Sequence, residues 1–197
     1  MLTLELEQME KSRKKTRLKK EIVSWAKTLV VVVLLVVAIR AFLFTNYIVY
    51  GQSMMPTIND RERVIINKIG YDIGEPDRFD MIVFHATETT DYIKRVIGLP
   101  GDTIEVQGDQ LYINGEVVEE FFLNGVLDEH RNYPYTMDFT LEQLTGERYV
   151  PEDHLFVLGD NRRNSIDSRQ IGFVPIDKVV GKADITYWPP KAFRVLK

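Results

Sequence analysis

A continuous run of apolar residues near the N-terminus constrains the fold of this chain more than any other feature. Its uncharged core, residues 28–39, has 12 residues, fewer than the roughly 20 that span a bilayer as a helix. Residues 25–44 make a 20-residue segment in which Lys27 and Arg40 lie about one turn from the ends. Their side chains can reach the membrane interface from there. We therefore predict a transmembrane helix at residues 25–44.

Charge is distributed unevenly on the two sides of this run. Residues 1–27 carry eight basic against four acidic side chains, whereas the chain after Thr45 carries 16 basic against 25 acidic ones. Basic residues beside a membrane span tend to stay in the cytoplasm. We therefore predict a cytoplasmic basic segment at residues 1–24 and an extracytoplasmic domain at residues 45–197.

Two other interpretations of the apolar run remain open. A basic region followed by a short apolar stretch is also typical of a cleavable signal peptide, although Phe42, Leu43 and Phe44 are too bulky for its small-residue cleavage site. The second alternative is a buried strand in a soluble protein, and the basic flank argues against it.

Short strand-like runs dominate the chain from residue 47 onward. They are rich in β-branched and aromatic residues, and they lie at residues 47–50, 63–67, 81–84, 91–98, 103–106, 110–113, 116–118, 155–158 and 179–187. Gly108-Asp109 and Asn114-Gly115 separate neighbouring runs as tight hairpin turns do. The sequence predicts a mainly β domain, folded as a barrel or coiled sheet. We expect an inserted subregion at about residues 105–152, with a short helix at 141–144.

Ser53 lies in the stretch GQSMMPTI, residues 51–58. A serine hydroxyl is a weak nucleophile until a base removes its proton. A Ser/His/Asp triad would require the fold to bring His85, His130 or His154 to Ser53. The chain has no cysteine, which excludes thiol catalysis, disulfides and cysteine-ligated zinc.

A buried lysine is the other base that can serve a serine, because loss of solvent lowers its pKa. Lys94 lies in the strand-like run 92–97, where alternation places Tyr92 and Val96 on its face and Arg95 on the other. Arginine stays protonated and cannot act as a base. The pattern alone does not separate a catalytic lysine from one whose amine reaches solvent.

A polar stretch, residues 159–169 (GDNRRNSIDSR), follows the strand-like run at 155–158. Its paired charges could orient a base, or they could form a salt-bridged turn.

Four stretches and the apolar run occur together, in this order, in one protein family. The stretches are Gly51–Ile58, Arg78–Phe84, Tyr92–Asp102 and Gly159–Arg169. With the preceding apolar run they resemble the type I bacterial signal peptidases, in the shorter form typical of Gram-positive bacteria. The resemblance extends from about residue 20 to Pro189 and is weakest at 119–150.

The resemblance implies a membrane-bound serine endopeptidase at the plasma membrane of a bacterium. It would remove signal peptides from exported preproteins by cleavage after small-x-small sites. The family match makes Ser53 the nucleophile and Lys94 the general base, with no metal and no organic cofactor.

The resemblance also assigns supporting roles. Ser165 matches a serine that hydrogen-bonds the lysine, and Asp167 and Arg169 match a supporting ion pair. Gly51 stands where some relatives have a serine that serves as a second oxyanion donor, so the source of that donor stays open. Phe79 stands where many relatives have glycine, and we expect a packing adjustment there.

Substrate recognition is expected to follow strand physics. An extended peptide can add to a sheet edge, with alternate side chains entering pockets. The residues that the family match assigns to these pockets are Val49, Met54, Ile58, Tyr92 and Ile93. Each has an ordinary alternative as strand core. The expected partners are signal peptides of secretory preproteins and the lipid bilayer, and no nucleic acid.

Two other function classes remain as alternatives. One is a membrane-tethered β module that binds a partner without chemistry, which the presence of both Ser53 and Lys94 disfavours. The other is a Ser/Lys self-cleaving regulator with a DNA-binding half, which the basic run directly before an apolar span disfavours. The sequence predicts no oligomeric state.

Overall fold

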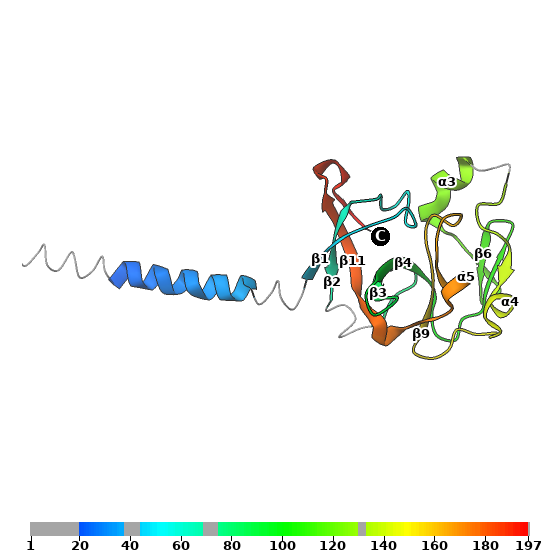
Figure 1. Ribbon diagram of the computed structural model, residues 1–197, viewed down its shortest axis with the longest axis horizontal. Coiled ribbons are helices and arrows are strands. Elements are labelled where there is room, and N and C mark those ends of the chain that lie inside the picture. The colour runs from blue at the N-terminus through cyan, green and yellow to red at the C-terminus, as the bar shows by residue number, and fades with distance from the viewer. Residues whose placement is uncertain (1–19, 38–43, 69–74, 130–132, 197) are drawn as a thin grey trace, which may run out of the picture. The chain divides into compact units, whose positions relative to one another are not determined.

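The structure of the protein, a computed structural model, describes residues 20–37, 44–68, 75–129 and 133–196 (Figure 1). The chain divides into two compact units, Met1–Leu43 and Phe44–Lys197.

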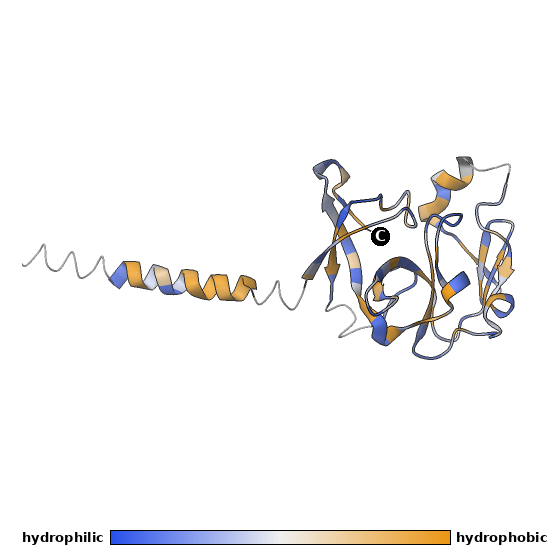
Figure 2. Ribbon diagram, viewed as in Figure 1, coloured by the Kyte–Doolittle hydropathy of each residue, from blue (hydrophilic) through white to orange (hydrophobic). Residues whose placement is uncertain are grey.

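The first unit contains a helix at residues 20–37. Its apolar side chains are exposed, and the ribbon of this helix is mostly coloured as hydrophobic in Figure 2. Within the described ranges, the structure has no helix with the length and apolar character needed to cross a membrane. The predicted span at 25–44 lies partly on residues 38–43, outside the described residues. Its last residue is not helical, because Phe44 begins strand β1 (Phe44–Ile48); an aromatic residue suits a strand as well as an apolar helix.

The second unit is built around an eight-stranded sheet whose order is β1-β2-β11-β3-β4-β9-β10, with β12 paired to β11. The other strands of this sheet are β2 (Arg63–Asn67), β3 (Met81–His85), β4 (Asp91–Gly98), β9 (His154–Leu158), β10 (Val174–Pro175), β11 (Val179–Trp188) and β12 (Arg194–Val195). The strand pairs in this sheet are antiparallel. Strand β4 lies inside the sheet between β3 and β9, and its second half is buried.

The chain between β4 and β9 forms a second, four-stranded sheet with the order β7-β6-β5-β8. Its strands are β5 (Ile104–Gln107), β6 (Gln110–Ile113), β7 (Glu116–Val118) and β8 (Phe139–Thr140). The described helices of the whole second unit are α3 (Asn124–Glu129), α4 (Leu141–Thr145) and α5 (Ser168–Ile171). Its short 3-10 turns are η1 (Phe121–Leu123), η2 (Ile176–Lys178) and η3 (Pro190–Ala192). Figure 1 shows β1 and β11 on one side of this unit and β6 and α4 on the other.

The two predicted hairpin turns join β5 to β6 and β6 to β7. Gly108 and Asp109 have φ of 58° and 62°, and Asn114 and Gly115 have φ of 53° and 82°. Positive φ at both central residues is the geometry that matches the twist of a hairpin. The mainly β prediction is therefore confirmed, whereas closure into a barrel stays a prediction.

Three apolar clusters form the core, and two of them position the segments discussed below. One packs the second sheet against β4 and β9 through residues such as Ile97, Leu111 and Phe156. Another lies beneath β1 and β2 and contains Met54 and Ile58. Burial of a side chain such as Met54 contributes about 1.5–3 kcal/mol, so the loop after β1 is anchored by its own sequence.

Candidate active site

Ser53 lies in the loop between β1 and β2. The ends of this loop are joined by backbone bonds, from the N–H of Val49 to the carbonyl of Glu62 and from the N–H of Arg61 to the carbonyl of Val49. Met54, directly after Ser53, is only 1% exposed. The buried methionine directs one side of the turn into the core and leaves the serine at the surface of a pocket.

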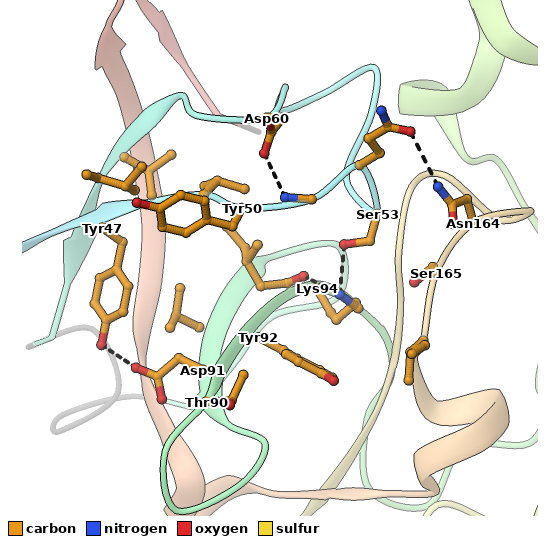
Figure 3. A pocket seen from close by; sticks show the side chains of 18 of the residues that line it. Tyr47, Tyr50, Ser53, Asp60, Thr90, Asp91, Tyr92, Lys94, Asn164 and Ser165 are labelled. Atoms are coloured by element: carbon orange, nitrogen blue, oxygen red, sulfur yellow. Dashed lines mark hydrogen bonds between the residues drawn. The ribbon is translucent and has the colours of Figure 1, made fainter.

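Lys94 reaches Ser53 from β4. Its Nζ donates to Oγ of Ser53 at 2.9 Å and to the carbonyl of Ile93 at 2.9 Å, and it lies 5.0 Å from the ring centroid of Tyr92 (Figure 3). The residue is 4% exposed. Burial lowers the pKa of Lys94, and the negative charges of Asp167 and Asp160 raise it. Burial is the larger effect, and the pKa is lowered to about 8. A much larger share of the neutral amine is therefore present near neutral pH than for a solvated lysine.

The neighbouring cation, Arg95, points to the opposite face of β4 and is fully buried. Its guanidinium binds both carboxylate oxygens of Asp160, at 2.9 and 2.8 Å. Its Nη1 donates to the carbonyl of Phe79 at 2.8 Å, and its Cζ lies 3.9 Å from the ring centroid of Phe122. A bidentate pair of this kind satisfies the buried charge, which fixes the face that Lys94 presents to Ser53.

The polar stretch at residues 159–169 packs behind the lysine. Asp167 accepts bonds from the N–H of Gly159 at 3.0 Å and from Nε of Arg169 at 2.8 Å, and it caps the N-terminus of α5. Burial alone would raise the pKa of Asp167, but these bonds and the charge of Arg169 hold it below its ordinary value. The carboxylate therefore carries a negative charge behind the lysine.

Close backbone approach joins this stretch to the Ser53 loop. The N–H of Asn161 donates to the carbonyl of Ser53 at 2.9 Å, and its side-chain amide donates to the carbonyl of Gln52 at 3.0 Å. A Cβ placed on Gly159 would lie 2.5 Å from the carbonyl oxygen of Ser53 and 2.2 Å from Oγ of Ser165. Only glycine fits there without displacing its neighbours.

A pocket of about 1080 Å³ opens beside the serine and the lysine. Tyr47, Val49, Tyr92 and Ile93 line it, and so does Ser165. Within the described ranges the structure has no group of three or more histidine or acidic side chains that could hold a metal ion.

Not every predicted site residue lies where the sequence placed it. Met54 and Ile58 are buried in the core cluster beneath β1 rather than in the pocket lining. Gly51 lines the pocket, and its N–H donates to Oδ1 of Asp60 at 2.8 Å. The Oγ of Ser165 is buried and forms no bond to Lys94 among the described residues, and its contact with Asp167 helps to lower the pKa of that carboxyl.

The histidines considered as alternative bases lie elsewhere. Nδ1 of His85 is 2.6 Å from Oδ1 of Asp91, and Nδ1 of His154 is 2.8 Å from the carbonyl of Glu152. His130 lies outside the described residues. Lys94, rather than either described histidine, therefore contacts Ser53.

Comparison with known proteins shows the family to which the chain belongs. Residues 22–188 match the family model described as signal peptidase, peptidase S26. The chain belongs to the signal peptidase family, peptidase S26. A signal peptidase I of Bacillus caldolyticus is 52% identical over 163 residues, which are 83% of this chain and 90% of that protein. A signal peptidase IB of Staphylococcus aureus strain COL is 38% identical over 181 residues, 90% of this chain and 95% of that protein.

The fold is also similar to a solved member of the signal peptidase family. The crystal structure of a signal peptidase I from Enterococcus faecalis V583 is 46% identical, covers 56% of this chain and 97% of that chain, and gives a TM-score of 0.53.

Phe79 is the position at which the resemblance implies glycine in many relatives, and its backbone conformation is one that favours glycine. Phe79 has φ of 73°, a conformation in which a side chain is strained. Its ring packs edge-on against Phe121 and Phe122, with centroids 5.9 and 5.4 Å away. This aromatic cluster is the packing adjustment expected at Phe79.

Some contacts at this site had no signal in the sequence. Asn161 and Gly159 lie in a stretch that drew attention only for its charges, and their contacts with the Ser53 loop depend on the fold. The bond between Tyr47 and Asp91 likewise joins segments 44 residues apart.

Proposed function

We propose that this chain is a membrane-anchored serine endopeptidase that removes N-terminal signal peptides from exported preproteins, with Ser53 as nucleophile and Lys94 as general base. The observation that carries the proposal is the 2.9 Å contact between Nζ of Lys94 and Oγ of Ser53. Burial of the lysine and its lowered pKa give the amine the chemistry that this role needs.

In the proposed reaction, the neutral amine of Lys94 accepts the proton of Ser53 as Oγ attacks the scissile carbonyl. The resulting ammonium then donates a proton to the leaving amine. An acyl-enzyme at Ser53 remains, and a water that Lys94 deprotonates releases the signal peptide and restores the serine.

The oxyanion of the tetrahedral intermediate needs preorganised donors. We assign the backbone N–H of Ser53 to this role. The side chain that some relatives place two residues earlier is missing at Gly51, so we expect the second donor to be a backbone group or a water. Asp167 and Arg169 would keep the environment of Lys94 charged, and Ser165 would line the pocket beside it.

The substrate would bind as an extended strand in the pocket beside Ser53. Val49, Tyr92 and Ile93 would contact the side chains before the cut and favour small residues there. Met54 and Ile58 would act indirectly, since they support the loop from beneath.

The apolar segment that begins at residue 25 would anchor the chain in the plasma membrane, with residues 1–24 in the cytoplasm and the unit from β1 onward outside. This part of the proposal is supported by the apolar run and its basic flank. The same location brings the serine to signal peptides that are themselves inserted in the bilayer.

The test is cleavage of a purified preprotein by the full chain in lipid vesicles, with the new N-terminus sequenced. We expect cleavage after a small-x-small site by the unaltered chain, and none by Ser53→Ala or Lys94→Met. Lys178→Met is the matched control, because it makes the same substitution at an exposed position in η2.

Two results would contradict the proposal. Cleavage that persists in Lys94→Met would assign the general base to another group. No cleavage by the unaltered chain, in vesicles where a related signal peptidase is active, would favour a tethered binding module.

A further inference from the structure

A second polar contact crosses the pocket at a distance from the serine. The phenol of Tyr47 in β1 donates to Oδ2 of Asp91 in β4 at 2.7 Å (Figure 3). The other carboxylate oxygen, Oδ1, is 2.6 Å from Nδ1 of His85, which pairs with Asp91 in the β3–β4 register. Both Tyr47 and Asp91 line the pocket.

The charges at this contact favour a strong bond. Burial, with the bond to Asp91 and its negative charge, raises the pKa of Tyr47 to about 12. Burial would raise the pKa of Asp91, but its bonds to Tyr47 and His85 hold it below its ordinary value. At neutral pH a neutral phenol therefore donates to a carboxylate, and such charge-assisted bonds are about twice as strong as neutral ones.

The contact joins β1 and β4, two walls of the pocket that are not neighbouring strands in the sheet. In the strand order, β2, β11 and β3 separate β1 from β4. Ser53 follows Tyr47 by six residues on one wall, and Lys94 follows Asp91 by three residues on the other. At about 3.3 Å per residue, Asp91 lies roughly 10 Å along the strand from Lys94.

The two walls are thus connected twice, by Lys94 and Ser53 at one place and by Tyr47 and Asp91 at another. A strand that adds between two others needs about 4.8 Å on each side. The gap between the two walls must therefore be about twice this spacing. A long tyrosine side chain that meets an aspartate can bridge such a gap, whereas two short side chains cannot.

We propose that Tyr47 and Asp91 are positioning residues whose hydrogen bond sets the separation of the pocket walls to the width of one extended peptide. His85 holds the carboxylate in the orientation that faces Tyr47. The inference rests on the proposed function and specifies how its substrate is accommodated. Neither residue exchanges a proton with the substrate. Loss of either side chain should therefore raise KM more than it lowers kcat.

The test compares kcat and KM for a preprotein with the full chain in vesicles. We expect Tyr47→Phe and Asp91→Ala each to raise KM about fivefold to tenfold, with kcat changed less than about twofold. Asp91→Asn keeps an acceptor for the phenol, so its KM should stay near that of the unaltered chain. Tyr112→Phe is the matched control, since it removes a phenol bond to Gln110 on β6, outside the pocket lining.

A double variant separates positioning from general damage. If the two side chains act through one bond, Tyr47→Phe combined with Asp91→Ala should raise KM no more than either change alone. Equal KM values for Tyr47→Phe and Tyr112→Phe would overturn the inference, and so would additive effects in the double variant. If Tyr47→Phe strongly lowers the unfolding temperature, the two Asp91 variants decide whether the hydrogen bond acts on KM. A lower KM in Asp91→Asn than in Asp91→Ala supports the inference, and equal KM values overturn it.

Failure of the proposed function has a different signature. In that case the unaltered chain would show no cleavage that depends on Ser53 and Lys94, and the inference would fall with it.

Discussion

Lys94 depends on its surroundings for its proposed chemistry, and the pH dependence of the reaction should reveal this. We expect kcat/KM to rise with pH and to level off above about pH 8, because only the neutral amine can accept the serine proton and the pKa of Lys94 is lowered to about 8. The measurement is kcat/KM against pH with one preprotein. A profile that is flat between about pH 7 and pH 9 would contradict the assignment.

Gly159 provides a second prediction at the scale of one residue. Gly159→Ala would place a Cβ 2.5 Å from the carbonyl oxygen of Ser53, and the Ser53 loop must move. Since a displacement of about 1 Å can cost about 100-fold in rate, we expect kcat to fall by about that factor.

Gly125→Ala in α3 is the control for this change, because a Cβ there meets nothing within 4 Å. Unaltered kcat in Gly159→Ala would show that the close approach does not position the serine. The unfolding temperature of both variants shows whether the loss is local.

At the scale of an element, β4 carries two cations to opposite faces and stabilises only one of them with a bidentate partner. Arg95→Met would leave Asp160 buried without its partner, and we expect the free energy of unfolding to fall by about 3–5 kcal/mol. Urea unfolding in detergent measures it. Arg61→Met, at an exposed pair with Asp60, should change it by less than about 1 kcal/mol; equal losses in the two variants would contradict the role of Arg95.

The elements that the sequence predicts well are those with a strong local pattern. The bounds of β2, β4, β6 and β7 agree with the predicted runs, and the hairpin turns occur where Gly, Asp and Asn permit positive φ. The elements missed, such as β10 and α5, are short and owe their existence to contacts with distant residues. Helix α5 begins where Asp167 caps it, which no periodicity reveals.

The candidate site divides in the same way. Chemistry and family resemblance predict Ser53 and Lys94 as the catalytic pair, but both faces of β4 are apolar in sequence. The choice of face depends on Asp160, which lies 65 residues after Arg95. The sequence left Met54 and Ile58 open between pocket lining and core, because strand alternation does not apply within the irregular loop after β1; the structure buries both in the core.

At the scale of the whole molecule, the proposed topology can be tested directly because the chain has no native cysteine. In intact bacterial cells, we expect a membrane-impermeant maleimide to label Lys178→Cys, because η2 belongs to the unit proposed to lie outside. Lys20→Cys should react only after the cells are opened. The converse labelling pattern would reverse the proposed orientation.

Asp167 has two tasks, since it starts helix α5 and supplies a negative charge to Lys94. A substitution of Asp167 that changed the pKa of Lys94 would also weaken the turn that holds Arg169 and Gly159. A related enzyme adapted to more acidic or more alkaline surroundings could therefore not change that pKa at this position alone. Asp160, the other negative charge near the amine, is likewise tied to the buried Arg95. Adjustment would therefore have to come from the apolar side chains that shield the amine. Differences in working pH among related enzymes should therefore map to residues that carry no charge.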